Sequence, residues 1–118
     1  MKIPNQIQGQ KYILLSTFRR NGQAVSTPLW FAERDDKIIF STRNDSGKYK
    51  RLRNNSKVTV APCNIRGKIT GPQFAGTARV LPVEQWPEAK RILDRKYWLR
   101  RLPVWSKHNE YLEVEMGS

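Results

Sequence analysis

The stretch FSTRNDSGKYKRLRNNSKVTVAPC, from Phe40 to Cys63, contains the most informative pattern in this chain. Residues 37–42 (KIIFST) and 57–63 (KVTVAPC) are rich in β-formers, and both are predicted to be strands. The segment between them is polar and basic, and it has the pattern of a short helix that ends at about Asn54. We therefore expect two strands joined by a basic helix, and the rest of the chain has to fit around this unit.

Three neighbouring residues can cap the start of this helix. Asn44, Asp45 and Ser46 all have side-chain oxygens that accept hydrogen bonds from the first free N–H groups, and Ser46 is the preferred cap. Tyr49 and Leu52 lie three residues apart, so they would bury one side of the helix against the sheet.

The first turn of the helix is basic, and no acidic residue follows to balance it. Lys48 and Arg51 are predicted on one face near the start, where a helix presents free N–H groups and partial positive charge. Gly47 would let an anion approach the backbone, so these residues describe a phosphate seat. The alternative is an ordinary capped helix with a solvated basic surface, and that description fits Lys50 and Arg53, which are predicted to point away.

The composition limits the class of protein. A chain of 118 residues suggests one domain with a single core, spanning residues 1–118. Membrane spans and a signal peptide are not expected, so the predicted location is the cytoplasm. The only cysteine, Cys63, is expected to be a buried strand thiol, the only histidine, His108, a surface residue, and no metal site is predicted. The net charge of +12 favours anionic partners, although a basic surface kept for solubility is the alternative.

Outside the opening stretch, the pattern predicts more strands and one longer helix. An Asn21-Gly22 turn joins the first two strands into a hairpin. The further predicted strands are 12–18, 24–32, 73–81 and 111–116. The helix follows Pro82 and is expected to end by about Leu102, before Pro103. Four apolar residues recur at helical spacing in it: Trp86, Ala89, Leu93 and Tyr97. Such a stripe favours packing on the sheet over any other role. The predicted fold is mainly β, a small antiparallel barrel or half-barrel with one short and one longer helix.

Two further stretches are unusual for plain strands. In VSTPLWF, residues 25–31, Pro28 sits where a central strand would need an N–H group, which indicates either an edge strand or a backbone that faces a ligand. Trp30 could flank a flat ring or pack in the core. In ITGPQFAGTAR, residues 69–79, the small residues indicate either close backbone approach to a ligand or simple barrel corners.

These three stretches, in this order, resemble the pyridoxamine phosphate oxidase-like flavin and deazaflavin oxidoreductases, in particular their short bacterial branch. The resemblance covers about Tyr12 to Leu81. It implies a split β-barrel of the FMN-binding type, and a homodimer with two flavin sites at the subunit interface. FMN is the expected cofactor, and a deazaflavin coenzyme is the alternative.

The resemblance also implies which residues bind the cofactor. The ring system would contact Thr27, Pro28, Leu29 and Trp30. The ribityl chain would lie along Phe40, Ser41 and Thr42. The phosphate would be held by Ser46, Gly47 and Lys48, with Arg51 beside them.

Two departures from the vitamin-forming oxidase limit the expected reaction. That enzyme has an arginine before the phosphate-binding lysine, where this chain has Gly47. It also has a C-terminal segment that grips the substrate phosphate, and nothing here corresponds to it. Oxidation of pyridoxamine phosphate is therefore not expected.

The predicted function is an FMN-dependent oxidoreductase that acts on an unidentified small molecule. No catalytic residue is predicted, because no histidine or paired carboxylate falls near the expected ring site. The alternatives are a deazaflavin-dependent reductase, a flavin-binding protein without catalysis, or a basic barrel that binds nucleic acid. Nucleic acid is not expected as a partner, because the aromatic residues do not recur at alternate positions of adjacent strands. No membrane partner is expected.

Overall fold

The computed structural model describes residues 2–43, 45–97 and 109–117. One antiparallel sheet of seven strands forms the body of the protein, in the order β2-β1-β5-β6-β7-β4-β3. Its strands have the following bounds: β1 Tyr12–Phe18, β2 Ala24–Trp30, β3 Ala32–Arg34, β4 Lys37–Arg43, β5 Lys57–Cys63, β6 Phe74–Val80 and β7 Asn109–Met116. The helices are α1 Gly47–Asn54, the 3-10 turn η1 Val83–Gln85, and α2 Trp86–Lys96. The predicted mainly-β half-barrel with two helices is thus confirmed.

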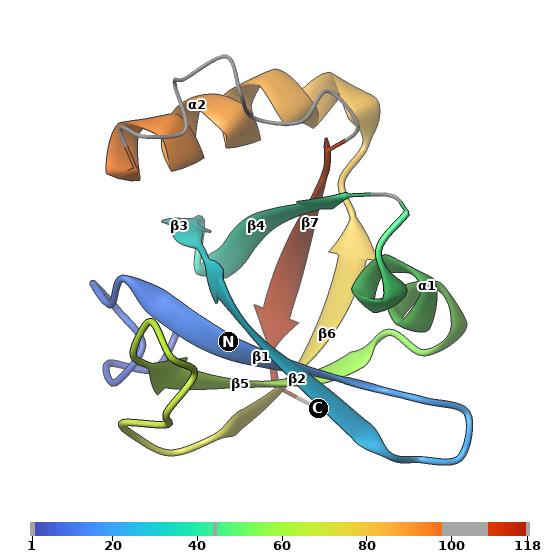
Figure 1. Ribbon diagram of the computed structural model, residues 1–118. Coiled ribbons are helices and arrows are strands. Elements are labelled where there is room, and N and C mark those ends of the chain that lie inside the picture. Colours follow the sequence, from blue (N-terminus) through green and yellow to red (C-terminus); the bar gives the residue numbers. More distant parts are fainter. Residues whose placement is uncertain (1, 44, 98–108, 118) are drawn as a thin grey trace.

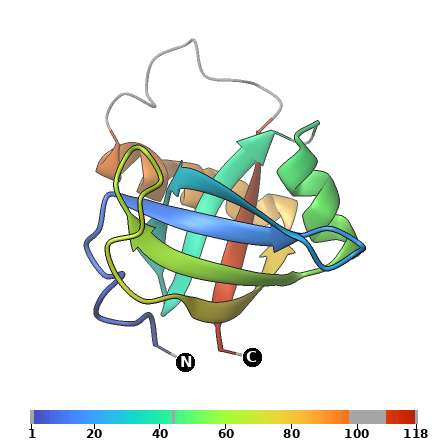
Figure 2. The same ribbon diagram turned by 60° about the horizontal axis from the view of Figure 1, so that its bottom comes forward.

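The sheet curls so strongly that β1 and β5 cross in front of β4 and β7 (Figure 2). Its two edge strands, β2 and β3, follow each other in the chain and are separated only at Phe31. The prediction of one strand over residues 24–32 was wrong at this point, because the chain changes partner there. Ala24 to Trp30 pairs with β1, whereas Ala32 to Arg34 pairs with β4.

The main core fills the inside of this curled sheet. Buried apolar side chains of the five strands β1, β4, β5, β6 and β7 meet there, and Leu52 of α1 and Ile7 of the N-terminal segment join them. Helix α1 lies beside the barrel, on the side where β4 ends (Figure 1). The predicted burial of Tyr49 and Leu52 is confirmed.

A second core lies between α2 and the outer face of the sheet. Helix α2 runs across the ends of β4 and β7 (Figure 1), and the predicted apolar stripe packs there. Ala89, Leu93 and Tyr97 are buried, and Trp86 is partly buried against the same cluster. On β7, Leu112, Val114 and Met116 face the main core.

Helix α2 ends earlier than the sequence indicated. It was expected to continue to about Leu102, but its last residue is Lys96, and Tyr97 has φ −125° and ψ 86°. The reason is tertiary, because Tyr97 leaves the helix to contact Trp30 and the backbone of Phe31. His108 lies outside the described residues.

Two smaller predictions are confirmed. Pro28 lies on β2, which is an edge strand of the described sheet and pairs there with β1 alone, so its missing N–H breaks no central ladder. Cys63 is a buried strand thiol, and burial raises its pKa. Within the described ranges, no helix has both the length and the apolar character needed to cross a membrane.

Candidate functional site

The predicted cap residue begins α1 as expected. Ser46 has extended backbone angles, and its Oγ accepts a hydrogen bond of 3.1 Å from the N–H of Tyr49. The hydroxyl of Thr42, near the end of β4, lies 3.1 Å from the same Oγ. Two of the predicted site residues are thus hydrogen-bonded to each other, and the end of β4 sets the position of the helix start.

The buried side of α1 holds the helix against the barrel. Tyr49 donates a hydrogen bond of 2.9 Å from its hydroxyl to Oε1 of Glu110 on β7, while Leu52 enters the main core. Lys50 and Arg53 are exposed, as the sequence indicated. These contacts fix the orientation of α1, so that another side of the helix, which carries Lys48 and Arg51, faces β1.

Lys48 and Arg51 lie together on that side. Lys48 is half-buried, and its pKa is lowered first by burial and then by the nearby charge of Arg51. Arg51 donates from Nε to Oγ1 of Thr17 on β1 at 2.6 Å. Within residues 2–43, 45–97 and 109–117, neither cation has an acidic partner, whereas the neighbouring Arg43 is paired with Asp45. Two adjacent positive charges without a counter-charge form a site suited to an anion.

Gly47 leaves room for this arrangement. A Cβ atom built on Gly47 would lie 2.9 Å from a terminal nitrogen of Arg51, so the guanidinium lies directly over the first residue of the helix. The glycine was predicted to give an anion access to the backbone. In the structure, the space above Gly47 contains the Arg51 side chain.

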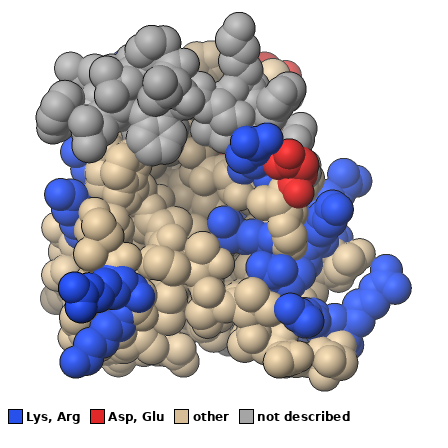
Figure 3. Space-filling model, in the orientation of Figure 1, with Lys and Arg blue, Asp and Glu red and all other residues tan. Residues whose placement is uncertain are grey.

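Figure 3 shows the face of the molecule that carries this site. Its centre is a hollow lined by uncharged side chains, and basic side chains gather along the side of the hollow where α1 lies. A hollow with a basic rim suits a ligand that has a flat apolar part and an anionic end.

The predicted ribityl-binding residues lie on β4, which leads into the site. Thr42 is buried and contacts Ser46, and Ser41 is half-buried. Phe40 is completely buried in the main core, so it offers no exposed surface to a ligand in this structure.

The predicted ring-binding residues of β2 point in different directions. Thr27 and Leu29 are half-buried, and Leu29 packs against the main core. Pro28 is exposed on the other face of the strand. Trp30 packs in the second core and stacks on Tyr97. The residues that were predicted to bind the phosphate therefore lie closer together than those that were predicted to bind the ring system.

Sequence reasoning missed Thr17. It follows Ile13 and Leu15 at alternate positions of β1, so it lies in an inward-facing apolar row and is itself completely buried. A polar residue in such a row is the signal that could have pointed to it, because a buried hydroxyl needs a partner.

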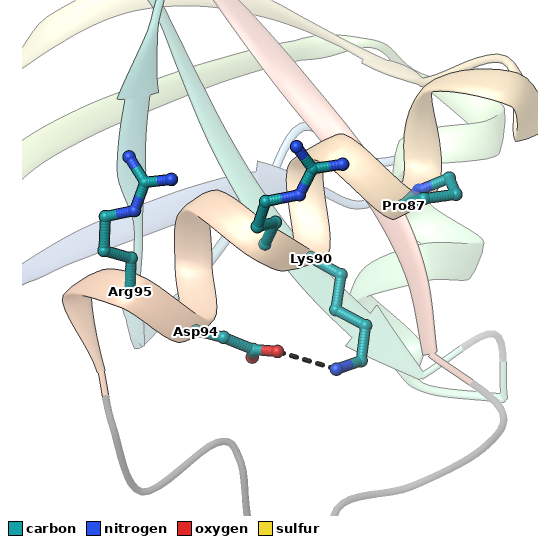
Figure 4. Close-up of a pocket in the computed structure, with 5 residues that line it drawn as sticks. Pro87, Lys90, Asp94 and Arg95 are labelled. Atoms are coloured by element: carbon teal, nitrogen blue, oxygen red, sulfur yellow. Dashed lines mark hydrogen bonds and ion pairs between the residues drawn. The ribbon is translucent and has the colours of Figure 1, made fainter.

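Two other hollows of the described surface are lined largely by charged side chains. One groove of about 460 Å³ runs along the outer face of α2, where Lys90 and Asp94 form an ion pair of 2.6 Å (Figure 4). Arg95 points away from that pair (Figure 4). A second hollow of about 450 Å³ has Glu113, Arg34 and Arg79 among its lining residues. None of the predicted cofactor-binding residues lines either of them.

Several solved structures have the same fold. The chain is similar to an F420 reductase, with 16% identity and a TM-score of 0.69 over 98% of this chain and 97% of that one. It is similar to a FAD-binding protein from Mesorhizobium loti, with 16% identity and a TM-score of 0.67 over 96% and 86% of the two chains. A heme binding protein from Mycobacterium smegmatis has 9% identity and a TM-score of 0.72; the match covers 94% of this chain and 48% of that one.

Similarity at this level of identity establishes the fold alone. No curated protein sequence matches the chain. The sequence model of the pyridoxamine 5'-phosphate oxidase family, in contrast, matches residues 2–115, nearly the whole chain, and confirms the resemblance seen in the three stretches. By its sequence and by its split-barrel fold, this chain belongs to the pyridoxamine 5'-phosphate oxidase family.

Proposed function

We propose that this protein binds FMN, with the cofactor phosphate at the start of α1, and that it works as a flavin-dependent oxidoreductase. The observation that carries the proposal is the pair Lys48 and Arg51. Both cations lie beside the Ser46-capped helix start, and neither has an acidic partner in the described part of the chain. A phosphate would supply the missing negative charge and accept hydrogen bonds from both side chains.

The rest of the cofactor would lie along β4 and β2. Ser41 and Thr42 offer hydroxyl groups next to the phosphate seat, which suits a ribityl chain. Strand β2 is an edge strand, so one side of its backbone has no strand partner in the sheet. Backbone groups from Thr27 to Trp30 are therefore suited to hydrogen bonds with the polar edge of a flavin ring.

FMN, when bound, would supply the hydride chemistry, and the protein would supply binding, orientation and one open face of the ring. We assign no acid or base among the residues of the site. The substrate is proposed to be a small molecule. Pyridoxamine phosphate is not proposed, because Gly47 replaces the arginine expected in that enzyme.

A deazaflavin coenzyme is the second candidate. An F420 reductase has the same fold over 97% of its length, so a chain of this size can carry that chemistry. The seat at α1 fits either cofactor, since both place a phosphate beyond a ribityl chain. FMN is preferred because one terminal phosphate is enough to satisfy Lys48 and Arg51.

We further propose a homodimer with the flavin between the subunits. A half-barrel of this length is too small to cover both faces of a three-ring system, and the second subunit would provide the missing surface. The exposed apolar side chains of Ile65, Ile69, Val80 and Val83 add area that a partner could cover.

Ligand binding to the purified protein tests the proposal. FMN, riboflavin and a deazaflavin coenzyme are titrated separately, and thermal unfolding is followed at each concentration, since a bound ligand raises the unfolding temperature by mass action. We expect FMN to give the largest shift. A protein that none of these ligands stabilises, and that retards labelled oligonucleotides instead, would be a nucleic-acid-binding barrel.

A further inference from the structure

The side chain of Arg51 is held from a distant part of the chain. Thr17 lies on β1, in the inward-facing row of Ile13 and Leu15, and is completely buried. Its Oγ1 accepts the hydrogen bond of 2.6 Å from Nε of Arg51, across a separation of 34 residues. The Thr17 hydroxyl also lies 3.5 Å from the carbonyl oxygen of Val25 on β2, to which its single proton can point.

This contact determines which nitrogens of Arg51 remain available to bind a ligand. Nε is directed inward at Thr17, and a terminal nitrogen lies over Gly47, where a Cβ atom would be only 2.9 Å away. The guanidinium has two terminal nitrogens, each with two N–H groups in a planar fork, and this fork suits the oxygens of a phosphate.

The arrangement also keeps two like charges close together. The charge of Arg51 contributes to lowering the pKa of Lys48, so the two cations interact. Their repulsion would be relieved if the flexible Arg51 side chain turned into solvent. The hydrogen bond to Thr17 opposes that movement. If Arg51 turned away, the completely buried hydroxyl of Thr17 would lose this hydrogen bond, which costs free energy.

We propose that Thr17 is a positioning residue of the anion seat: its buried hydroxyl holds the Arg51 guanidinium over Gly47, beside Lys48. The seat then presents two positive charges to one ligand group. A terminal phosphate monoester carries about 1.5 to 2 negative charges at neutral pH, and it is the ligand class that such a seat fits. This inference rests on the proposed function, since FMN ends in a phosphate monoester.

The test compares FMN with riboflavin, which lacks the phosphate, in wild type and in Thr17→Val. The valine side chain has a similar shape but cannot accept the hydrogen bond from Arg51. We expect Thr17→Val to weaken FMN binding about tenfold and to leave riboflavin binding unchanged. Thr17→Ser, which keeps the hydroxyl, should restore most of the FMN affinity. Thr59→Val on the neighbouring strand β5 is the matched control and should change neither affinity.

Gly47→Ala provides a second, independent perturbation. The backbone of Gly47 has an ordinary helical conformation that alanine can adopt, so the protein should fold at least as well as wild type. The added Cβ would displace the Arg51 guanidinium, and FMN affinity should fall while riboflavin affinity stays the same. This variant tests, with Thr17 unchanged, whether the position of the Arg51 guanidinium over Gly47 affects the preference for FMN.

The outcomes separate the two proposals. If wild type binds FMN no better than riboflavin, the phosphate seat itself is wrong, and the proposed function fails with it. If wild type prefers FMN but Thr17→Val and Gly47→Ala keep the full preference, the seat is real and the role of Thr17 is overturned. Equal losses for FMN and riboflavin in Thr17→Val would show a general packing role and would also overturn the inference.

Discussion

The ring of Trp30 lies flat on the ring of Tyr97, with centroids 4.7 Å apart and planes 5° apart. The Tyr97 hydroxyl lies 2.8 Å from the carbonyl oxygen of Phe31, 2.6 Å from that of Lys11, and 3.2 Å from the N–H of Phe31. The end of α2 is thereby joined to the point where β2 gives way to β3. The backbone proposed to face the flavin ring comes directly before that point.

Tyr97→Phe keeps the stacked ring and removes these hydrogen bonds. The polar groups of Phe31 are buried, so losing their partner should lower the free energy of unfolding by about 1–3 kcal/mol. Urea denaturation measures this directly. The control is Tyr12→Phe on β1, because the described residues offer no hydrogen bond to the Tyr12 hydroxyl; its change should stay within about 0.5 kcal/mol. Equal effects of the two substitutions would contradict the bridging role of Tyr97.

Lys48→Ala should weaken FMN binding strongly and riboflavin binding very little. A charge-assisted contact to the phosphate contributes about 1.5–3 kcal/mol, which corresponds to roughly ten- to more than a hundredfold in affinity. Lys50→Ala is the matched control, since Lys50 lies on the exposed side of the same helix. Titrations of both ligands against both variants give the answer. If the two lysines contribute equally, the helix is only a charged surface and the phosphate binds elsewhere.

Glu113→Gln should destabilise the fold without touching the proposed site. The Glu113 carboxylate is almost fully buried on β7, and it binds Nε of Arg79 at 2.5 Å and lies 3.5 Å from Arg34. Removing its charge should lower the free energy of unfolding by about 1.5–3 kcal/mol, because two arginines lose a buried counter-charge. Glu115→Gln changes an exposed residue of the same strand and should cost less than about 0.5 kcal/mol. Chemical denaturation of both variants distinguishes these outcomes.

Lys96 should make stability depend on pH in the alkaline range. Its Nζ lies 3.8 Å from the centre of the Phe31 ring and donates to the carbonyl of Gln10, and burial lowers its pKa from 10.5 to about 8, with Glu33 opposing the shift. Between these two pH values the unfolded chain binds more protons at this group than the folded chain. The contribution of Lys96 to stability therefore rises as the pH increases from about 8 to 10.5.

The Lys96→Met variant isolates that contribution. Unfolding free energies of both proteins are measured over the same pH range, and their difference removes the effects of all other groups. We expect the wild-type curve to rise relative to the variant across this window. Parallel curves would show that the folded-state pKa of Lys96 is close to that of a free lysine.

The protein should be a dimer when it carries flavin. Light scattering coupled to size exclusion gives the mass of the FMN-bound protein, and absorbance gives the number of flavins per chain. We expect twice the mass of the 13.8 kDa chain and one flavin per subunit. A monomer that binds FMN tightly would show that one half-barrel is sufficient to cover the cofactor.

Local patterns in the sequence determined most of the secondary structure and the grouping of the residues proposed to bind the phosphate. The Ser46 cap, the buried pair Tyr49 and Leu52, and strand β5 were all predicted correctly, because capping and alternation depend on residues that are close in the chain. Lys48 and Arg51 lie within one helical turn of each other, so their proximity also followed from the sequence.

Features that depend on residues distant in the chain could be seen only in the folded structure. The change of partner strand at Phe31, the early end of α2 at Lys96 and the stacking of Trp30 on Tyr97 all involve contacts between residues far apart in the chain. The role of Thr17 is of the same kind, since it is defined by Arg51 on another element. No local pattern encodes such pairs, because the free energy that favours them arises only when the curled sheet brings both residues to the same place.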